Sequence, residues 1–312
     1  MPDRVVVPAG LERQRALGDG WARWLDRLPG LTASLLDAWE LEPDGPSMHG
    51  FCSLVLPVRT PEGRPAVLKV HTDADAQESD HEHLALQRWR GRGAVRLLRA
   101  DPGRRALLLE RLRQTDLRDH WDEEACRIVA GLYPLLHLAP MPQLRPQVSY
   151  VERWTDALAR DAAAVPVPRR LVEQTVALAR DLCGEPPTAV IHADLHYENV
   201  LLAERDDGPT WVAIDPKPTN GDPHYELEPM LRNRFEEYGE VGSVRDGIRR
   251  RFHALVDAAG FDERRARDWV VVRSVVNAHW AFADALRADR SMTADEQTHV
   301  TRCITVAKAV QD

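Results

Sequence analysis

The stretch that decides the fold of this chain is His192-Ala-Asp-Leu-His-Tyr-Glu-Asn199. It is a polar loop between two short apolar runs, Ala189-Val-Ile191 and Val200-Leu-Leu202, which we predict to be strands. A further apolar run, Trp211-Val-Ala-Ile214, ends at Asp215. The pattern predicts a hairpin that follows the polar loop and carries a carboxylate at its far end.

The polar side chains in this loop have the spacing that phosphoryl transfer requires. His-x-Asp-x-x-x-x-Asn is the order found in a kinase catalytic loop. The carboxylate of Asp194 could orient an attacking hydroxyl and accept its proton, and the carbonyl oxygen of Asn199 could bind Mg²⁺. Asp215 would be a second metal ligand, because Mg²⁺ takes few protein carboxylates and completes its shell with phosphates and water. We therefore predict Asp194 as catalytic base and Asn199 and Asp215 as metal ligands.

A simpler interpretation of the same residues is structural. Asp194, Asn199 and Asp215 are of types common in turns. With 12 His, 28 Asp and 4 Asn in the chain, the pattern has a chance expectation of roughly one in 70. His192 is expected to fix the loop through its ring nitrogens, and His196 to stabilise it, since no cysteine or serine partner is apparent. The kinase interpretation therefore needs independent support.

The lysines provide that support. Only three of the 41 basic residues are lysines, namely Lys69, Lys217 and Lys308. Since the chain nearly always uses arginine for a positive charge, a lysine points to a role that arginine cannot fill. Lysine presents a compact ammonium group on a flexible stem, which suits phosphate oxygens in a tight site. We assign no role to Lys308, which lies in a C-terminal helical stretch.

Lys69 ends the apolar run Ala66-Val-Leu-Lys69, where a kinase with a β-rich lobe places its phosphate-binding lysine. A glutamate on the following helix holds such a lysine. Glu82 lies 13 residues later in the chain, and Glu78, one turn earlier on the same helix face, is the alternative. A surface lysine on an edge strand is the competing interpretation, which the scarcity of lysine disfavours.

Hydrophobic periodicity divides the chain into two parts. The N-terminal part should contain helices and an antiparallel sheet, with helices at 11–28, 31–39 and 74–90 and strands at 39–42, 51–58, 66–70, 95–98 and 105–111. The rest should be mainly helical, at 121–138, 149–163, 168–183, 226–238, 244–259, 263–288 and 293–310. We predict an α+β protein, with a β-rich N-terminal domain at 1–111 and a helical domain at 112–312.

Composition narrows the class of protein. Hydrophobic residues make up 44% of the 312 residues and charged residues 29%, as in globular proteins. No apolar run is long enough to span a membrane, no secretory signal opens the chain, and the net charge of −8 argues against nucleic-acid binding. The four cysteines are widely scattered, which is typical of reduced thiols. We expect a cytoplasmic monomer that binds a small molecule.

The loop that should cover the phosphates is less typical. Residues 44–53 contain only Gly45 and Gly50 and lack the pattern Gly-x-Gly-x-x-Gly. Backbone amides around Gly50 and the hydroxyls of Ser47 or Ser53 could still contact phosphate oxygens. No Gly-x-x-x-x-Gly-Lys-Ser/Thr run is present, which argues against a P-loop kinase.

Taken together, these residues resemble the aminoglycoside phosphotransferase family, and within it the streptomycin 6-phosphotransferase and hydroxyurea phosphotransferase branch. The resemblance covers about residues 20–300. Its most specific segments are Ile191-His-Ala-Asp-Leu-His-Tyr-Glu-Asn-Val-Leu-Leu202, Ala213-Ile-Asp-Pro-Lys-Pro218 and Gly221-Asp-Pro223; others are Gly50-Phe-Cys-Ser-Leu-Val-Leu-Pro-Val58, Val67-Leu-Lys-Val70 and Ala106-Leu-Leu-Leu-Glu-Arg111.

The resemblance implies a protein-kinase-like two-lobed fold, ATP or GTP with Mg²⁺, and direct transfer to a hydroxyl of a small molecule. It implies the same roles for Asp194, Asn199, Asp215 and Lys69. It also places a hinge that meets the nucleotide base at Glu110 to Leu112. Asp222 matches the family's acidic residue after the metal-binding aspartate, with a structural role favoured over a catalytic one.

Two departures from related patterns concern the residues beside these aspartates. Protein kinases place Phe-Gly after the metal-binding aspartate, where this chain has Pro216-Lys217. Ala193 stands where a glycine is common before the catalytic aspartate. We hypothesise that Lys217 reaches the γ-phosphate or an acidic residue of the loop.

The acceptor is harder to predict. A cationic aminoglycoside would be bound by acidic side chains of the helical domain, and the candidates are Asp222, Glu226, Glu236, Glu237, Glu240 and Asp284. Solvated helix faces are the simpler explanation for most of them.

Three functions stay open at this point. The first is an antibiotic kinase acting on streptomycin or a related aminoglycoside, and the second a metabolic kinase of a sugar, an amino alcohol or another small metabolite. The third is a nucleotide-binding regulator without turnover, which the complete set of Lys69, Asp194, Asn199 and Asp215 disfavours. A protein kinase is disfavoured because no Ala-Pro-Glu segment follows Asp215.

Overall fold

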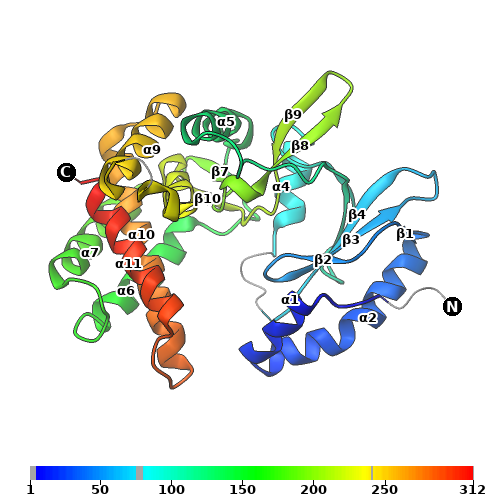
Figure 1. Cartoon of the computed structure of the whole chain (residues 1–312), viewed down its shortest axis with the longest axis horizontal. Helices are drawn as coiled ribbons and strands as arrows, with labels where there is room; N and C mark the ends of the chain where they lie inside the picture. The colour runs from blue at the N-terminus through cyan, green and yellow to red at the C-terminus, as the bar shows by residue number, and fades with distance from the viewer. Residues whose placement is uncertain (1–4, 75–79, 240–241, 312) are drawn as a thin grey trace. The chain divides into compact units, whose positions relative to one another are not determined.

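The computed structural model describes residues 5–74, 80–239 and 242–311. The chain forms two compact units, one of Met1–Thr115 with Leu201–Pro218 and one of Asp116–Val200 with Thr219–Asp312 (Figure 1). The domain boundary expected from the sequence, between residues 111 and 112, leaves 201–218 in the C-terminal part.

Residues 201–218 pack with the N-terminal unit because their backbone and one arginine bind there. Ala213 forms a parallel bridge with Ala94. The guanidinium of Arg205 lies 2.7 Å from the Glu110 carboxylate and also donates to backbone carbonyls at Gly91 and Ala94. This segment is the hairpin of β8 (Val200–Arg205) and β9 (Gly208–Ala213).

The N-terminal unit is built on a six-stranded antiparallel sheet of order β1-β3-β4-β6-β5, with β2 beside β3. The strands are β1 (Glu42–Pro43), β2 (Met48–His49), β3 (Ser53–Arg59), β4 (Pro65–His71), β5 (Leu97–Asp101) and β6 (Ala106–Glu110). The predicted strands at 51–58, 66–70, 95–98 and 105–111 are therefore confirmed within a few residues. The strand predicted at 39–42 is misplaced, because Trp39 ends a helix and the first strand begins only at Glu42.

One long helix covers this sheet. α2 (Asp19–Trp39) follows α1 (Ala9–Glu12) and a 3-10 turn, η1 (Arg13–Leu17), and Figure 1 draws these elements in dark blue. The prediction of two helices, at 11–28 and 31–39, misplaced the break. The chain stays helical through Pro29 and Gly30, with Leu28 and Leu35 fully buried on either side in a core that includes Leu54 and Leu68 of the sheet.

The helix predicted at 74–90 is shorter in the structure. α4 (Glu82–Trp89) begins at Glu82, and Leu86 and Trp89 are fully buried. Part of the predicted span, residues 75–79, lies outside the described residues.

The second unit is mainly helical, as predicted. Its longer helices are α5 (Asp122–Leu136), α6 (Gln147–Arg160), α7 (Arg169–Cys183), α9 (Val244–Ala259), α10 (Glu263–Arg287) and α11 (Ala294–Ala309). α10 contributes Trp269, Val272 and Val276 to a core shared with α6 and α7. No helix among the described residues is both long and apolar enough to cross a membrane.

The helix predicted at 226–238 is wrong. The chain there forms three short pieces, η3 (Pro223–Leu227), α8 (Glu228–Arg232) and η4 (Phe235–Gly239). It breaks because Asn233 is extended (ψ 154°) and Arg234 is left-handed (φ 53°). Tertiary contacts hold that break, since buried Arg251 donates to the carbonyls of both residues.

A small two-stranded sheet supports the polar loop. β7 (Ala189–Ile191) pairs antiparallel with β10 (Thr219–Gly221), a strand that the sequence did not predict. A Cβ on Gly221 would lie 2.4 Å from Oε1 of Gln147 and 2.6 Å from Cδ1 of Ile191. A side chain at position 221 would require Gln147 and Ile191 to shift, so Ile191, from which the polar loop leaves the sheet, is tightly packed.

Candidate active site

Lys69 is the centre of a charged cluster in the N-terminal unit. It lies on β4 and is only 5% exposed. Its Nζ is 2.9 Å from each carboxylate oxygen of Glu82 and 2.5 Å from Oδ1 of Asp215. The partner of Lys69 is thus Glu82; the alternative, Glu78, lies outside the described residues.

All three side chains of the cluster are held in their charged forms. Burial alone would lower the pKa of Lys69, but attraction to Asp215 and Glu82 outweighs it and raises that pKa above its usual value. Burial alone would raise the pKa values of Glu82 and Asp215, yet Lys69 brings both below their usual range. A single ammonium therefore faces two carboxylates, a set that can hold both a phosphate and a metal ion.

His71 is a fourth member of the cluster that the sequence analysis missed. Its Nε2 lies 2.8 Å from Oε2 of Glu82, and the side chain is 4% exposed. The period of two in a strand places His71 on the same face of β4 as Lys69, which was the available signal. Glu82 is therefore shared by two basic side chains.

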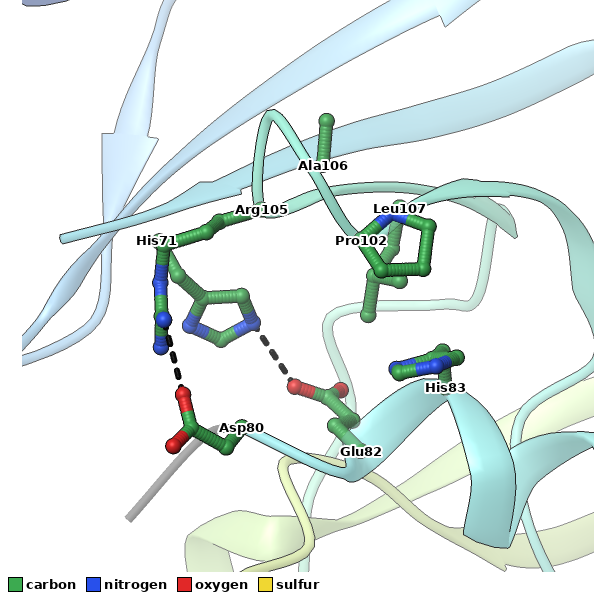
Figure 2. A pocket seen from close by; sticks show the side chains of 8 residues that line it. All are labelled: His71, Asp80, Glu82, His83, Pro102, Arg105, Ala106 and Leu107. Atoms are coloured by element: carbon green, nitrogen blue, oxygen red, sulfur yellow. Dashed lines mark hydrogen bonds and ion pairs between the residues drawn. The ribbon is translucent and has the colours of Figure 1, made fainter. Parts of the chain in front are cut away.

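A small pocket lies beside His71 and Glu82. Figure 2 shows its lining residues, His71, Asp80, Glu82, His83, Pro102, Arg105, Ala106 and Leu107, with Asp80 and Arg105 joined at 2.7 Å. Its volume of about 70 Å³ is far below the range of about 300–1,000 Å³ typical of ligand sites. The pocket is too small for a nucleotide.

The polar loop around Asp194 is held by hydrogen bonds between its own side chains and its backbone. The Asp194 N–H donates to Nδ1 of His192 at 3.2 Å, and the Asn199 amide donates from Nδ2 to the Asp194 carbonyl at 2.8 Å. His196 accepts the Glu198 N–H through Nδ1 at 3.4 Å. His192 and His196 thus stabilise the loop, as predicted. With Nδ2 engaged, the carbonyl oxygen of Asn199 is the group that a metal ion would take.

Glu226 does not fit the prediction that it binds substrate. Its side chain has no exposed surface, and its two oxygens accept the backbone N–H groups of His192 at 2.6 Å and Ala193 at 3.1 Å. Burial alone would raise its pKa, but the interactions with His137 and His192 hold that pKa below its usual value. Glu226 is an internal anion beneath the loop.

Asp222 is also occupied by the protein itself. Its carboxylate accepts hydrogen bonds from Trp269 Nε1 at 2.6 Å and Arg265 Nε at 2.5 Å, and it lies 2.7 Å from His224 Nδ1. Burial alone would raise its pKa, but the bonds to His224 and Trp269 hold that pKa well below its usual range. These contacts agree with the structural role favoured from the sequence and leave no oxygen for a substrate.

The other acidic candidates differ in how available they are. Glu237 is bound to Arg234 at 2.5 Å. Glu236 pairs with Arg302 at 2.5 Å but keeps 67% of its side chain exposed. Asp284 pairs with Arg287 on the surface, and Glu240 lies outside the described residues. Glu236 is the most accessible of the four residues Asp222, Glu226, Glu236 and Glu237.

The remaining nucleotide-site candidates belong to the N-terminal unit. The Gly50 N–H donates to the Ser53 carbonyl at 3.0 Å, which closes a tight turn at the start of β3, and Ser53 is 2% exposed. The Glu110 carboxylate binds Arg205 and the Arg96 N–H, and the Glu110 N–H donates to the Arg96 carbonyl at 3.0 Å. Leu112 and Lys217 follow β6 and Asp215 respectively, in the same unit.

Two comparisons with known proteins agree on the family. The model of the aminoglycoside/hydroxyurea antibiotic resistance kinase family matches residues 38–285. A streptomycin 6-kinase of Streptomyces glaucescens is 38% identical over 289 residues, covering 91% of this chain and 92% of that protein. A hydroxyurea phosphotransferase of Kitasatospora aureofaciens is also 38% identical, over 90% of this chain and 81% of its own.

A solved structure shows the same fold at low identity. A choline/ethanolamine kinase family protein from Mesorhizobium loti matches with a TM-score of 0.61 and 15% identity, over 90% of this chain and 95% of its own. The predicted α+β, protein-kinase-like fold is therefore confirmed.

Proposed function

This chain belongs to the aminoglycoside/hydroxyurea antibiotic resistance kinase family, and on that premise we propose that it transfers the γ-phosphoryl group of ATP to the 6-hydroxyl of streptomycin. The observation that carries the proposal is the Lys69–Glu82–Asp215 cluster, a set that suits a metal-bound nucleotide. The family and the resemblance to streptomycin 6-kinases supply the acceptor.

We propose the following role for each residue. Asp194 orients the acceptor hydroxyl and accepts its proton. Lys69, oriented by Glu82, binds the α- and β-phosphates. Backbone groups near Gly50 and Ser53 contact phosphate oxygens, and the backbone from Glu110 to Leu112 meets the adenine.

Asp215 and Asn199 would hold Mg²⁺. Carboxylate and amide oxygens are the ligands this ion prefers, and the residues present fit it in that respect. Held by these two residues, the ion would supply positive charge that offsets the negative charge of the phosphates. Asp215 is already ionised and partly exposed, with 37% of its side chain accessible.

Lys217 is proposed to contact the γ-phosphate. Charge-assisted contacts of this kind are strong enough that Lys217→Ala should lower kcat or raise the nucleotide KM by about tenfold. Steady-state kinetics with varied ATP measure both constants. If neither constant changes, Lys217 has no role in the site.

A cationic acceptor also needs negative charge on the protein. We propose Glu236 as one contributor, because it is exposed and lies in the short η4 element. We further propose that the enzyme acts as a monomer in the cytoplasm, where ATP is available.

A second acceptor, hydroxyurea, is favoured by one specific observation. The hydroxyurea phosphotransferase and the streptomycin 6-kinase have the same identity to this chain. Overall similarity therefore does not separate the two acceptors. Hydroxyurea is small and uncharged, so it would have no need of acidic residues around the acceptor.

One assay tests the proposal. ATP consumption, coupled to a spectrophotometric readout, is measured with streptomycin, other aminoglycosides, hydroxyurea and simple sugars, and with Asp194→Ala as control. We expect turnover with streptomycin and none in the control. Turnover that survives in Asp194→Ala would refute the mechanism, and activity only on a sugar would refute the antibiotic assignment but leave the kinase.

A further inference from the structure

Ala193, immediately before Asp194, has a backbone conformation that disfavours a side chain. Its φ is +64°, in the left-handed region where a Cβ crowds the neighbouring carbonyl. Glycine adopts this region freely, whereas alanine must be held there by its surroundings. The residue before the proposed catalytic base is therefore strained in the folded protein.

Two buried charged side chains hold Ala193 from both sides. Glu226 accepts the Ala193 N–H at 3.1 Å and the preceding His192 N–H at 2.6 Å. Arg273, on α10, donates to the Ala193 carbonyl and, at 2.9 Å, to the Tyr225 carbonyl. The peptide groups on either side of Ala193 are thus bound by an anion and a cation respectively.

We propose that Glu226 and Arg273 are positioning residues that hold Ala193 in its left-handed conformation and thereby place the Asp194 carboxylate for catalysis. This inference rests on the proposed role of Asp194 as the base. The Ala193 carbonyl that Arg273 binds belongs to the peptide group that carries the Asp194 N–H, so any rotation at Ala193 swings Asp194. A misplacement of about 1 Å can lower a rate about 100-fold.

The burial of Glu226 and Arg273 argues against a role in stability alone. Glu226 is fully buried and Arg273 is 7% exposed. Charges at such depth are costly unless they are paired and hydrogen-bonded, and apolar residues of similar volume often serve stability as well or better. The two charged groups meet the backbone at the one residue of the loop where φ is positive. We therefore expect Glu226 and Arg273 to act on the backbone conformation of Ala193.

Neighbouring side chains orient Glu226 and Arg273, the pair that we call the clamp. The Arg273 guanidinium lies 4.3 Å from the centroid of the Tyr225 ring, and Tyr225 directly precedes Glu226. Arg273 also lies 3.5 Å from the Glu228 carboxylate, and Glu226 lies 3.4 Å from His137 Nε2. Each clamp residue is therefore oriented by at least one further charged or aromatic group.

The test combines a variant that weakens the contacts to Ala193 with a second variant that removes the backbone strain at that residue. Glu226→Gln keeps the shape but replaces one acceptor with an NH₂ group, and should lower kcat about 10- to 100-fold with little change in either KM. Adding Ala193→Gly should recover at least several-fold of that loss, because glycine needs no clamp at φ +64°. Ala189→Gly, on β7 in extended backbone, is the matched control and should give no recovery. Absence of recovery with Ala193→Gly would overturn the proposal.

A second measurement does not depend on activity. Hydrogen exchange at the amides of His192 and Ala193 should become faster in Glu226→Gln and not elsewhere in the second unit; unchanged exchange would also overturn the proposal. If Glu226→Gln does not fold, Arg273→Lys takes its place in both experiments. If the wild-type chain phosphorylates none of the acceptors, the proposed function fails, whereas the exchange result still tests the clamp.

Discussion

The Lys69 cluster and the Asp194 loop are built in opposite ways. In the N-terminal unit, side chains bind side chains, with one ammonium between two carboxylates and His71 behind them. In the second unit, side chains bind backbone, since Glu226, Arg273, His192 and Asn199 all bind main-chain groups of the loop. Asp194 is thus positioned through its peptide bonds, whereas Asp215 is positioned through its carboxylate.

This difference separates the expected kinetic effects. In the proposed function, a nucleotide and its metal exchange at the first region, where the charges face one another directly. The proposed base keeps one position in the second region, where side chains bind the backbone. Changes to the Lys69 cluster should therefore alter the nucleotide KM, and changes beneath the Asp194 loop should alter kcat.

The largest effect is expected for Asp194→Asn. Asparagine keeps the shape of the side chain but cannot accept the proton, so kcat should fall by about 10²- to 10⁴-fold, with thermal unfolding nearly unchanged. Glu198→Gln, an exposed acidic residue in the same loop, serves as control and should retain activity. Comparable kcat values for the two variants would exclude Asp194 as the base.

A smaller loss is expected for Lys69→Arg. The lysine is buried and contacts two carboxylates at once, and the larger planar guanidinium cannot reproduce that geometry. The kcat/KM for ATP should fall about 10- to 100-fold. Lys308→Arg, at an exposed position of α11, is the matched control. If both variants match the wild type, the preference for lysine at position 69 has no catalytic basis.

Glu82→Gln tests the comparison most directly. It removes one of the two carboxylates beside Lys69 and the partner of His71, so the nucleotide KM should rise by about tenfold while kcat changes less. Glu226→Gln should show the reverse pattern. An equal fall in kcat for both variants would contradict the distinction between the two regions.

The smallest effect on catalysis is expected for Asp222→Asn, which acts on stability. Because the folded-state pKa of Asp222 is depressed, its contribution is present above the unfolded pKa of about 3.9 and is lost as pH falls through the folded pKa. The substitution should lower the free energy of unfolding by about 3 kcal/mol at pH 7. The difference from wild type should shrink below about pH 4. Thermal melts across that range measure it, and a pH-independent difference would contradict the ionic role.

The candidate residues that the sequence identified share one property: each could be recognised from its spacing to other residues nearby in the chain. Asp194 and Asn199 lie within one short loop, and Asp215 ends the next apolar run. Lys69 stands out because lysine is rare in this chain, and Glu82 follows at the distance expected for its helix. Strand and helix periods also located most elements to within a few residues.

The features that were misjudged or missed from the sequence arise from contacts between distant segments. Glu226 was taken for a substrate ligand because its acidity is visible in the sequence, whereas its hydrogen bonds to the loop 33 and 34 residues away are not. Arg273 reaches the same loop from 80 residues away. β10 is only three residues long, and it exists because it pairs with β7.

The sequence by itself determined the family, the α+β fold and the chemical groups available for phosphoryl transfer, because short-range spacing and residue type carry that information. Only the tertiary structure decided which acidic residues are available to a ligand and which are buried supports. Burial and hydrogen bonding to backbone set the environment of a carboxylate, and both arise from segments far apart in the chain. The run from His192 to Asn199 supplies the carboxylate that we propose as the base, and Glu226 and Arg273 bind the backbone of the residue before it.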